Sequence, residues 1–241
     1  MSGINPMHQF ELSNVVEIEA FGYNFSLTNG AISMFVAIGC AILMALGLRK
    51  HNKMIPNRLQ SALEMIIGTL KNAVGGILGE EGEKYVPYVF SVFLFVLTLN
   101  LLGLIPGSFA ETSHISMTFA LALTMFFTCL MISIGKHGIK FLKIFIPAGT
   151  PWWLAPLMFV LEFFSYCIRP VSIAIRLAAN MIAGHVMLDV IAFFVIMMGV
   201  FGVLPLAFLM ILMAFEAFVA ILQAYIFSIF TSVYISESIE G

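Results

Sequence analysis

Charged side chains are scarce in this sequence: Asp, Glu, Lys and Arg make up 10% of the 241 residues, whereas hydrophobic residues make up 61%. Soluble domains contain about 25% charged residues, so the composition excludes an ordinary soluble protein and indicates an integral membrane protein. The apolar runs are continuous rather than alternating, which predicts membrane helices and excludes barrel strands.

Cysteines are few, and the common enzyme motifs are missing. Cys40, Cys129 and Cys167 lie in apolar runs without a CxxC pair, so we interpret them as packing residues. There is no glycine-rich nucleotide loop, nucleophile triad or zinc-ligand spacing, and we expect no cofactor, no metal and no nucleic-acid partner. The first thirty residues contain no Lys or Arg, which predicts that there is no signal or transit peptide.

The last apolar region predicts two long helices. Its main internal break is at 199–205, where two glycines and Pro205 favour a turn. The first helix, 152–198, would be ~70 Å long at ~1.5 Å per residue. This exceeds the thickness of a bilayer, so the helix must tilt steeply, bend near Pro170 or break into two spans. Earlier runs long enough to span a membrane lie near 31–48, 86–105 and 115–135.

The basic residues predict the orientation of the chain. Nine of the eleven Lys and Arg lie in two connections, 49–84 and 136–143, whereas the N-terminal tail and the loop at 106–114 contain none. By the positive-inside rule the two connections face the cytoplasm or matrix, the N-terminus lies outside and the C-terminus inside.

Apolar residues in 57–78 recur at helical spacing, which predicts an amphipathic helix on the inner membrane face. A helix buried against the others is the alternative.

Several polar residues interrupt the long apolar region, and spacing groups some of them into a stripe. Glu162, Arg169 and Arg176 recur every seven residues and share one helix face, which Asn180 extends. A charge at the bilayer centre costs about 2.5–3.5 kcal/mol, so these groups should face protein or water and should have a function. An internal salt bridge is the alternative, above all for Arg169, which lies within helical reach of Glu162.

Other polar residues lie on a different face. His185 is half a revolution from Arg176 and shares its side with Asp189. On the second long helix Glu216 and Gln223 are seven residues apart, so Gln223 can meet the arginine stripe or Glu216 can meet His185. A cationic face and a separate titratable pair are suited to moving protons.

Three stretches carry a specific resemblance: LNLLGLIP (99–106), RPVSIAIRLAANMIAGH (169–185) and EAFVAILQAYIFSIF (216–230). Over nearly the whole chain the sequence resembles the a-subunit family of the membrane (Fo) sector of rotary F-type ATP synthases. The opening NPMHQF (5–10) is most similar to alphaproteobacterial and mitochondrial members. The resemblance implies a non-catalytic, proton-translocating stator subunit of an energy-coupling membrane, either the bacterial or the mitochondrial inner membrane.

The resemblance also implies partners and a fold. The partners are a rotor ring of small c-type subunits, peripheral-stalk b-type subunits, other ATP synthase membrane subunits and the lipid bilayer. The fold is an all-α integral membrane protein, with two long, steeply tilted helices beside the ring. The expected segments are an outer tail (1–30), a first span (31–50), an inner connection with the amphipathic helix (51–84), a transmembrane hairpin (85–135), an inner basic loop (136–151) and the long helix pair (152–241).

The resemblance assigns the arginine stripe a role. Arg176 matches the essential arginine that faces the ring, and Gln223 and Asn180 match its polar neighbours. A positive charge near a ring carboxylate favours the ionised form, so Arg176 would drive each passing carboxylate to release its proton. Arginine does not itself lose a proton at a working pH, so it cannot relay protons directly between the two half-channels.

The half-channels are implied by other residues. His185 and Glu216 match the pair of the outer half-channel, although some bacterial members carry the acid and the histidine the other way round, and Glu162 matches the acidic residue of the inner one. Asp189 matches no family motif and is a possible member of the proton path, and Arg169 is structural or secondary. The sequence leaves H⁺ and Na⁺ both open, with H⁺ favoured.

Two hypotheses from other classes compete with this one. In a secondary transporter, Arg176 would bind an anionic substrate near the midplane, which predicts inverted repeats and broken helices that the sequence does not show. In a purely structural membrane subunit, neutralising Arg176 would leave transport intact.

Overall fold

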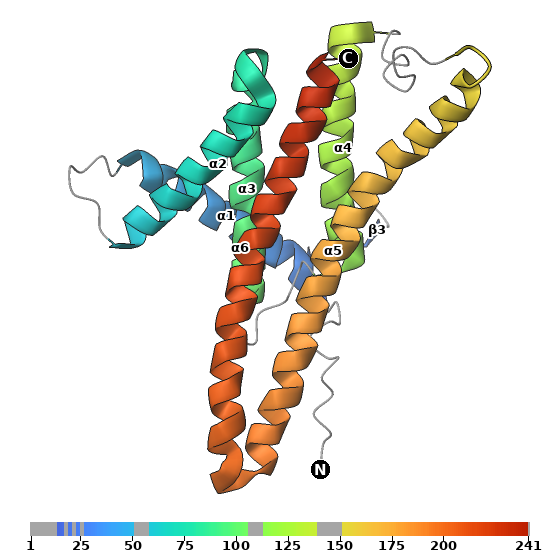
Figure 1. Ribbon diagram of the computed structural model, residues 1–241. Coiled ribbons are helices and arrows are strands. Elements are labelled where there is room, and N and C mark those ends of the chain that lie inside the picture. The colour runs from blue at the N-terminus through green and yellow to red at the C-terminus, as the bar shows by residue number, and fades with distance from the viewer. Residues whose placement is uncertain are drawn as a thin grey trace. The chain divides into compact units, whose positions relative to one another are not determined.

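The computed structural model describes residues 14–16, 19–20, 23–24, 27–50, 58–105, 113–138 and 151–240. The described chain is predominantly α-helical, which confirms the predicted fold class (Figure 1). The helices are α1 (Asn29–Lys50), α2 (Arg58–Gly82), α3 (Val86–Gly103), α4 (Ile115–His137), α5 (Ala155–Met197) and α6 (Val203–Glu240), with short 3-10 helices at η2 (Glu83–Tyr85) and η5 (Gly199–Gly202).

Four short strands, which no pattern in the sequence predicts, lie in the segment expected to be an outer tail. The strand β1 (Asn14–Val16) pairs antiparallel with β4 (Leu27–Thr28), and β2 (Glu19–Ala20) pairs antiparallel with β3 (Tyr23–Asn24). With only two or three residues each, they are a local feature of a helical protein.

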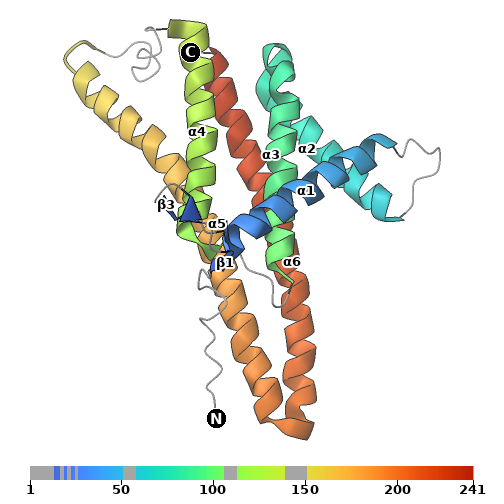
Figure 2. The same cartoon turned by 180° about the vertical axis from the view of Figure 1, so that it is seen from behind.

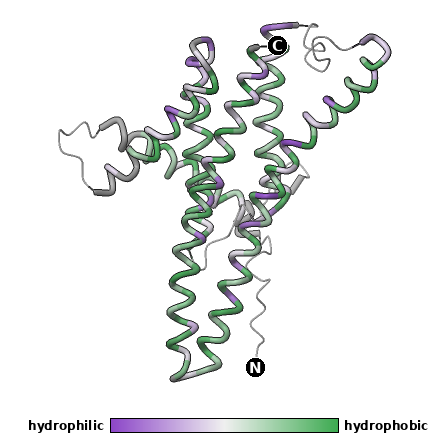
Figure 3. The backbone as a smooth tube through the Cα atoms, viewed as in Figure 1, coloured by the Kyte–Doolittle hydropathy of each residue, from purple (hydrophilic) through white to green (hydrophobic). Residues whose placement is uncertain are grey.

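Four of the described helices are long and apolar enough to cross a membrane. The candidate spans are Glu83–Gly103, Ile115–His137, Ala155–Met197 and Val203–Ile239. The residues of these helices are mostly hydrophobic, with isolated hydrophilic positions (Figure 3). The described apolar part of α1 is shorter, Gly30–Ala45, so the first span at 31–50 stays a prediction.

The first long helix is continuous. α5 contains 43 residues with Pro170 inside it, which corresponds to ~65 Å. The alternative that this region breaks into two spans is therefore wrong. α6, with 38 residues, is the second long helix.

The turn between the two long helices is the 3-10 helix η5, at the glycine-rich break that the sequence predicted. Gly199 has φ of 53°, in the left-handed region that glycine occupies without a steric penalty. A Cβ atom on Gly202 would lie 2.5 Å from the backbone oxygen of Val195. Since that neighbour is backbone and cannot move aside easily, a glycine is required for the turn to fold back this closely.

The chain divides into two compact units, in both of which α3, α5 and α6 take part. Unit 1 comprises Met1–Asn52, Phe93–Ile115 and Leu177–Ala224. Unit 2 comprises Lys53–Val92, Ser116–Arg176 and Tyr225–Gly241. In unit 1, α1 crosses α3 (Figure 2), and the Thr98 hydroxyl donates to the Met44 Sδ at 3.8 Å.

In unit 2, α2 is packed on one face and open on the other. Leu70, Val74 and Leu78, each four residues apart, are buried, and the Ser236 hydroxyl of α6 donates to the Ile77 carbonyl at 3.0 Å. The predicted helix in 57–78 is thus confirmed, whereas its place on the inner membrane face stays a prediction. Most of the predicted basic loop, residues 139–150, lies outside the described residues.

Polar contacts also join the ends of α4, α2 and α6 within unit 2. The His137 ring nitrogen Nε2 lies 3.1 Å from the Ile239 carbonyl oxygen. Lys136 pairs with Glu81 of α2, and this hydrogen bond lowers the pKa of the Glu81 carboxyl. Both side chains of the ion pair are exposed, so the pair contributes little to the free energy of unfolding.

Candidate functional site

A polar contact joins the two long helices within unit 1. The Asn180 amide nitrogen of α5 donates to the Gln223 side-chain oxygen of α6 at 3.3 Å. Gln223 is buried at 3% exposure, whereas Asn180 is exposed. Of the two alternatives left open for α6, Gln223 therefore meets the residue that extends the arginine stripe.

A second contact brings the Glu216 carboxylate against α5. A Cβ atom on Gly184 would lie 2.0 Å from Glu216 Oε1, so the carboxylate occupies the space that the missing side chain leaves. Glu216 is 7% exposed and the adjacent His185 is 8% exposed. The two alternatives for α6 do not exclude each other, since Glu216 packs against Gly184, the residue before His185, while Gln223 contacts Asn180.

His185 has its own polar surroundings. Its imidazole forms a hydrogen bond with the backbone of Gly103 in α3 and interacts electrostatically with the carboxylate of Asp189. Asp189 lies one turn further along α5, on the side that the spacing predicted. His185 and Asp189 are therefore neighbours, the first buried and the second half-buried.

Asn100 of α3 completes the polar side of unit 1. It is fully buried, and its side-chain amide donates to the Ala220 carbonyl of α6 at 3.2 Å. Asn100 lies in the LNLLGLIP stretch (99–106), for which the sequence predicts no polar role. The signal available was a lone amide in an apolar span, because such a group needs a hydrogen-bond partner inside the membrane.

Several buried polar atoms of unit 1 have no hydrogen-bond partner among the described residues. They are Asn100 Oδ1, Gln223 Nε2 and both carboxylate oxygens of Glu216. Buried polar atoms in native proteins are nearly always paired with protein or with ordered water. These atoms can therefore form hydrogen bonds with a group outside the described chain.

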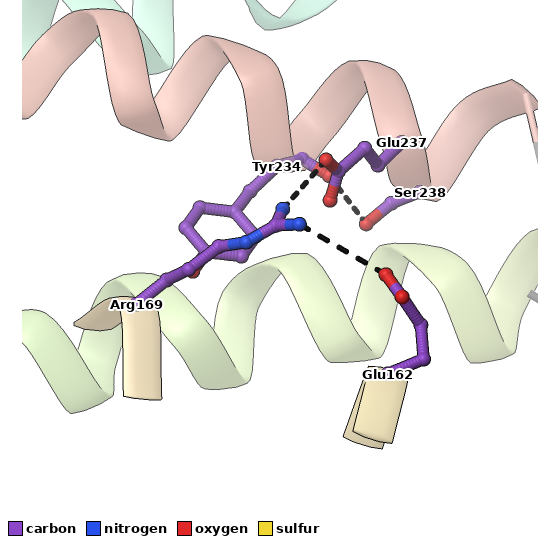
Figure 4. A network of polar contacts seen from close by, with 5 residues as sticks. All are labelled: Glu162, Arg169, Tyr234, Glu237 and Ser238. Carbon is purple, nitrogen blue, oxygen red and sulfur yellow. Dashed lines mark hydrogen bonds and ion pairs between the residues drawn. The ribbon is translucent and has the colours of Figure 1, made fainter. Parts of the chain in front are cut away.

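Unit 2 contains the second polar cluster, centred on Arg169 (Figure 4). The guanidinium Nη1 lies 2.7 Å from Glu237 Oε1 of α6, and Nη2 lies 3.9 Å from Glu162 Oε1, seven residues earlier in α5. The ion pair with Glu162 confirms that these two residues share a helix face. Arg169 is thus a charge between two carboxylates, each of which is only partly exposed.

Aromatic side chains cover this cluster on one side. Tyr166 of α5 meets Tyr234 of α6 edge to face, with ring centroids 5.3 Å apart, and Phe126 of α4 lies 5.2 Å from Tyr166. Tyr234 is 1% exposed. Ser238 turns inward and donates to the Tyr234 carbonyl at 2.7 Å. The packing fixes α4, α5 and α6 to one another within unit 2.

Arg176 is exposed at the end of unit 2 and forms no ion pair or hydrogen bond with a described residue of that unit. It contrasts with buried His185, as expected for two positions on opposite sides of one helix. An exposed guanidinium on a membrane helix is open to a partner outside the chain.

Comparison with known proteins identifies the family. The family model described as "ATP synthase A chain" matches residues 31–236. Proteins named ATP synthase subunit a are similar over 98% of both chains: 46% identical over 238 residues in Ehrlichia chaffeensis (strain ATCC CRL-10679 / Arkansas), 46% over 242 residues in Ehrlichia ruminantium (strain Welgevonden) and 45% over 239 residues in Ehrlichia canis (strain Jake). The chain belongs to the ATP synthase A chain family.

Membership of the ATP synthase A chain family confirms the resemblance seen in the sequence. The chain is an integral membrane subunit of the membrane sector, and ATP synthesis is catalysed by the complex as a whole. No group of His, Cys, Asp and Glu that could hold a metal ion is found in the described part of this ATP synthase A chain.

Glu237 of this ATP synthase A chain is, like Asn100, a site residue without a role predicted from the sequence. It lies two heptads after Gln223, so Glu216, Gln223 and Glu237 occupy one seven-residue series along α6. The series was a usable signal, because positions seven residues apart share a helix face. It was overlooked because Glu237 lies beyond the apolar run, where an acidic residue is unremarkable.

Proposed function

We propose that this chain is the proton-conducting stator subunit of the ATP synthase membrane sector. It provides two offset half-channels and an arginine, Arg176, that drives the deprotonation of carboxylates on a rotor ring of c-type subunits. The observation that supports this most is the separation of polar groups into two clusters, one in each unit, on helices that are otherwise apolar.

The outer half-channel is lined by His185 and Glu216, with Asp189 and Asn100 as further members. It is supported by the unpaired carboxylate oxygens of Glu216, which point to water in an otherwise closed packing. Histidine and carboxylate are the side chains that hold and release protons in membrane relays. A proton from the outer side would pass along this group to the ring.

The inner half-channel is lined by Glu162 and Glu237. Both carboxylates form ion pairs with Arg169, and the guanidinium holds them in a fixed position. Arg169 thus has a structural role in the proton path. A proton leaving the ring would pass to these carboxylates and on to the inner side.

Arg176 separates the two routes. Its exposure leaves it available to a ring carboxylate, and the Asn180–Gln223 contact fixes the helix turn that follows it. Since arginine stays protonated, a proton cannot hop across it and must travel on the ring. Each charge that crosses 100 mV supplies about 2.3 kcal/mol to the rotation.

The remaining features of the proposal concern the assembly. The chain contacts peripheral-stalk b-type subunits and other membrane subunits besides the ring. Its N-terminus lies outside and its C-terminus inside, as the basic residues predict. A secondary transporter would instead need broken helices at its substrate site, and α5 and α6 are continuous.

The inner route can be tested with Glu162→Gln. We expect a several-fold slower passive proton flux through the membrane sector after the soluble head is stripped, because Glu237 and water partly replace the lost carboxylate. The matched control is Glu81→Gln, which removes an exposed carboxylate of unit 2 and should leave the flux unchanged. A complete block would make Glu162 an obligatory relay, and an unchanged flux would remove it from the path.

The outer route can be tested at Gly184. In Gly184→Ala the new methyl group takes the space of Glu216 Oε1, and because that atom is the end of a flexible side chain, we expect assembly to persist and ATP-driven pumping to fall several-fold. Glu216→Asp shortens the side chain by one bond, ~1.5 Å, and should restore part of the pumping in the double variant. The control is Gly135→Ala, whose methyl group would meet no described atom within 4 Å.

No rescue by Glu216→Asp, in complexes shown to be assembled, would mean that the loss does not arise from the displaced carboxylate.

A further inference from the structure

A cavity of about 320 Å³ lies between α2 and the start of α3, entirely within unit 2. Its lining is apolar except for one lysine: Ile67, Leu70, Lys71 and Val74 of α2, and Val86, Pro87, Val89 and Phe90 of α3. It plays no part in the proton path proposed above. The volume is at the lower end of the range for small-ligand sites, so it fits a slender apolar group.

The lining of the cavity favours a hydrocarbon chain over a polar group. Seven apolar side chains offer no hydrogen-bond donor or acceptor, so a polar or water-soluble ligand would lose its hydration without compensation. A hydrocarbon chain has no such loss and gains from leaving water. Among the lining residues Pro87 is exposed and Val74 is buried, so the cavity extends to the surface of the helices and an acyl chain could enter there.

Lys71 favours a ligand with a negatively charged head group. Its side chain is exposed and forms no ion pair with a described residue of unit 2. Lysine lays its aliphatic stem along apolar surface and keeps its ammonium group at the polar edge, where it binds phosphate as a point charge. A single cation at the mouth of an apolar cavity is complementary to an amphiphile with an anionic head.

The position of the cavity in the chain agrees with this. The candidate membrane span that includes α3 begins at Glu83, so the cavity lies beside the first turns of a candidate membrane helix, where we expect lipid headgroups. Six of the eleven Lys and Arg lie in the connection at 49–84, which includes α2. This favours a place on the membrane side whose leaflet is rich in anionic lipid. Nearby Lys84 is engaged differently, with its ammonium 5.1 Å from the Tyr85 ring centroid.

We propose that the α2–α3 cavity is a binding site for an anionic phospholipid, with one acyl chain in the cavity and the phosphate on Lys71. The bound lipid would fill the space between the two helices and hold α2 against the membrane helix. A membrane helix of another subunit is the competing occupant, and the experiment below distinguishes the two.

The test uses the intact complex in vesicles that contain phosphatidylglycerol or phosphatidylcholine with a photoactivatable group in one acyl chain. After illumination, labelled peptides are mapped by mass spectrometry. We expect label in 67–90, with phosphatidylglycerol labelling about five-fold more than phosphatidylcholine, the preference that one lysine near a membrane surface provides. Lys71→Gln should abolish the preference and keep the labelling, whereas Ile67→Trp, which fills the cavity, should abolish both.

Lys84→Gln is the matched control, since it removes an exposed lysine of the same unit that does not line the cavity; it should behave as the unchanged chain does. A preference that survives in Lys71→Gln, or equal labelling by the two lipids in the unchanged complex, would overturn the proposal. Absence of label from 67–90 in the unchanged complex would overturn it too, because another chain would then occupy the cavity. Since labelling is read without proton flux, its outcome is independent of the proposed proton path.

Discussion

Replacement of Arg176 by alanine should abolish ATP-driven proton pumping in reconstituted vesicles while the complex still assembles. The side chain is exposed, so its loss creates no cavity and leaves no buried partner uncompensated. Without the cation, a ring carboxylate has no partner that favours its ionised form, and it keeps its proton as it passes. The measurement is the quenching of a pH-sensitive dye on addition of ATP, in complexes whose subunit composition has been verified.

Two further variants sharpen this prediction. Arg176→Lys should fail or nearly fail, because a desolvated ammonium group can release its proton whereas a guanidinium does not. Leu157→Ala, which truncates another exposed side chain of α5, should pump as the unchanged chain does. Pumping at the unchanged rate in assembled Arg176→Ala would favour a structural role for the arginine.

Exchange of His185 and Glu216 should show that they work as a pair. His185→Glu and Glu216→His each leave two like groups in the same buried region, so we expect each to lower pumping sharply. The double exchange restores one of each. Groups in contact couple by about 0.5–3 kcal/mol, so the double variant should pump clearly better than the product of the two single losses.

The control for this exchange combines His185→Glu with Glu162→His. Glu162 belongs to the Arg169 cluster of unit 2, so this combination should show only multiplicative loss. If the His185 and Glu216 exchange were also merely multiplicative, these two residues would not be partners. Asp189 would then be the first candidate for the partner of His185, because its charge acts on the same imidazole.

Much of the fold follows from the length and continuity of apolar runs. The two long helices and the glycine turn between them were predicted because few alternatives exist for uninterrupted apolar sequence in a bilayer. The continuity of α5 through Pro170 was left open, since sequence alone does not show whether neighbouring helices compensate for the lost backbone hydrogen bond. The short strands near the N-terminus have no such periodic signal, and their pairing was not predicted.

The candidate site was predictable where residues share a helix and less so where helices meet. Spacing alone placed Glu162 and Arg169 on one face, and the ion pair confirms it. Glu237 and Asn100 were missed because their importance comes from contacts with α5 and α6, 68 and 120 residues away in sequence. A local pattern can mark such residues as candidates, but it does not identify their long-range partners.

The tight turn at η5 also bears on how the long hairpin enters the membrane. Between Asp189 and Glu216 the sequence has no charged residue, and Phe201 and Leu204 at the tip are each 80% exposed. A charged side chain at the centre of a membrane helix costs about 2.5–3.5 kcal/mol, and a charge at the tip of the hairpin would have to cross that depth during insertion. A closed, uncharged tip avoids that step, so the second half of α5 and the first half of α6 are suited to insert together as a preformed pair.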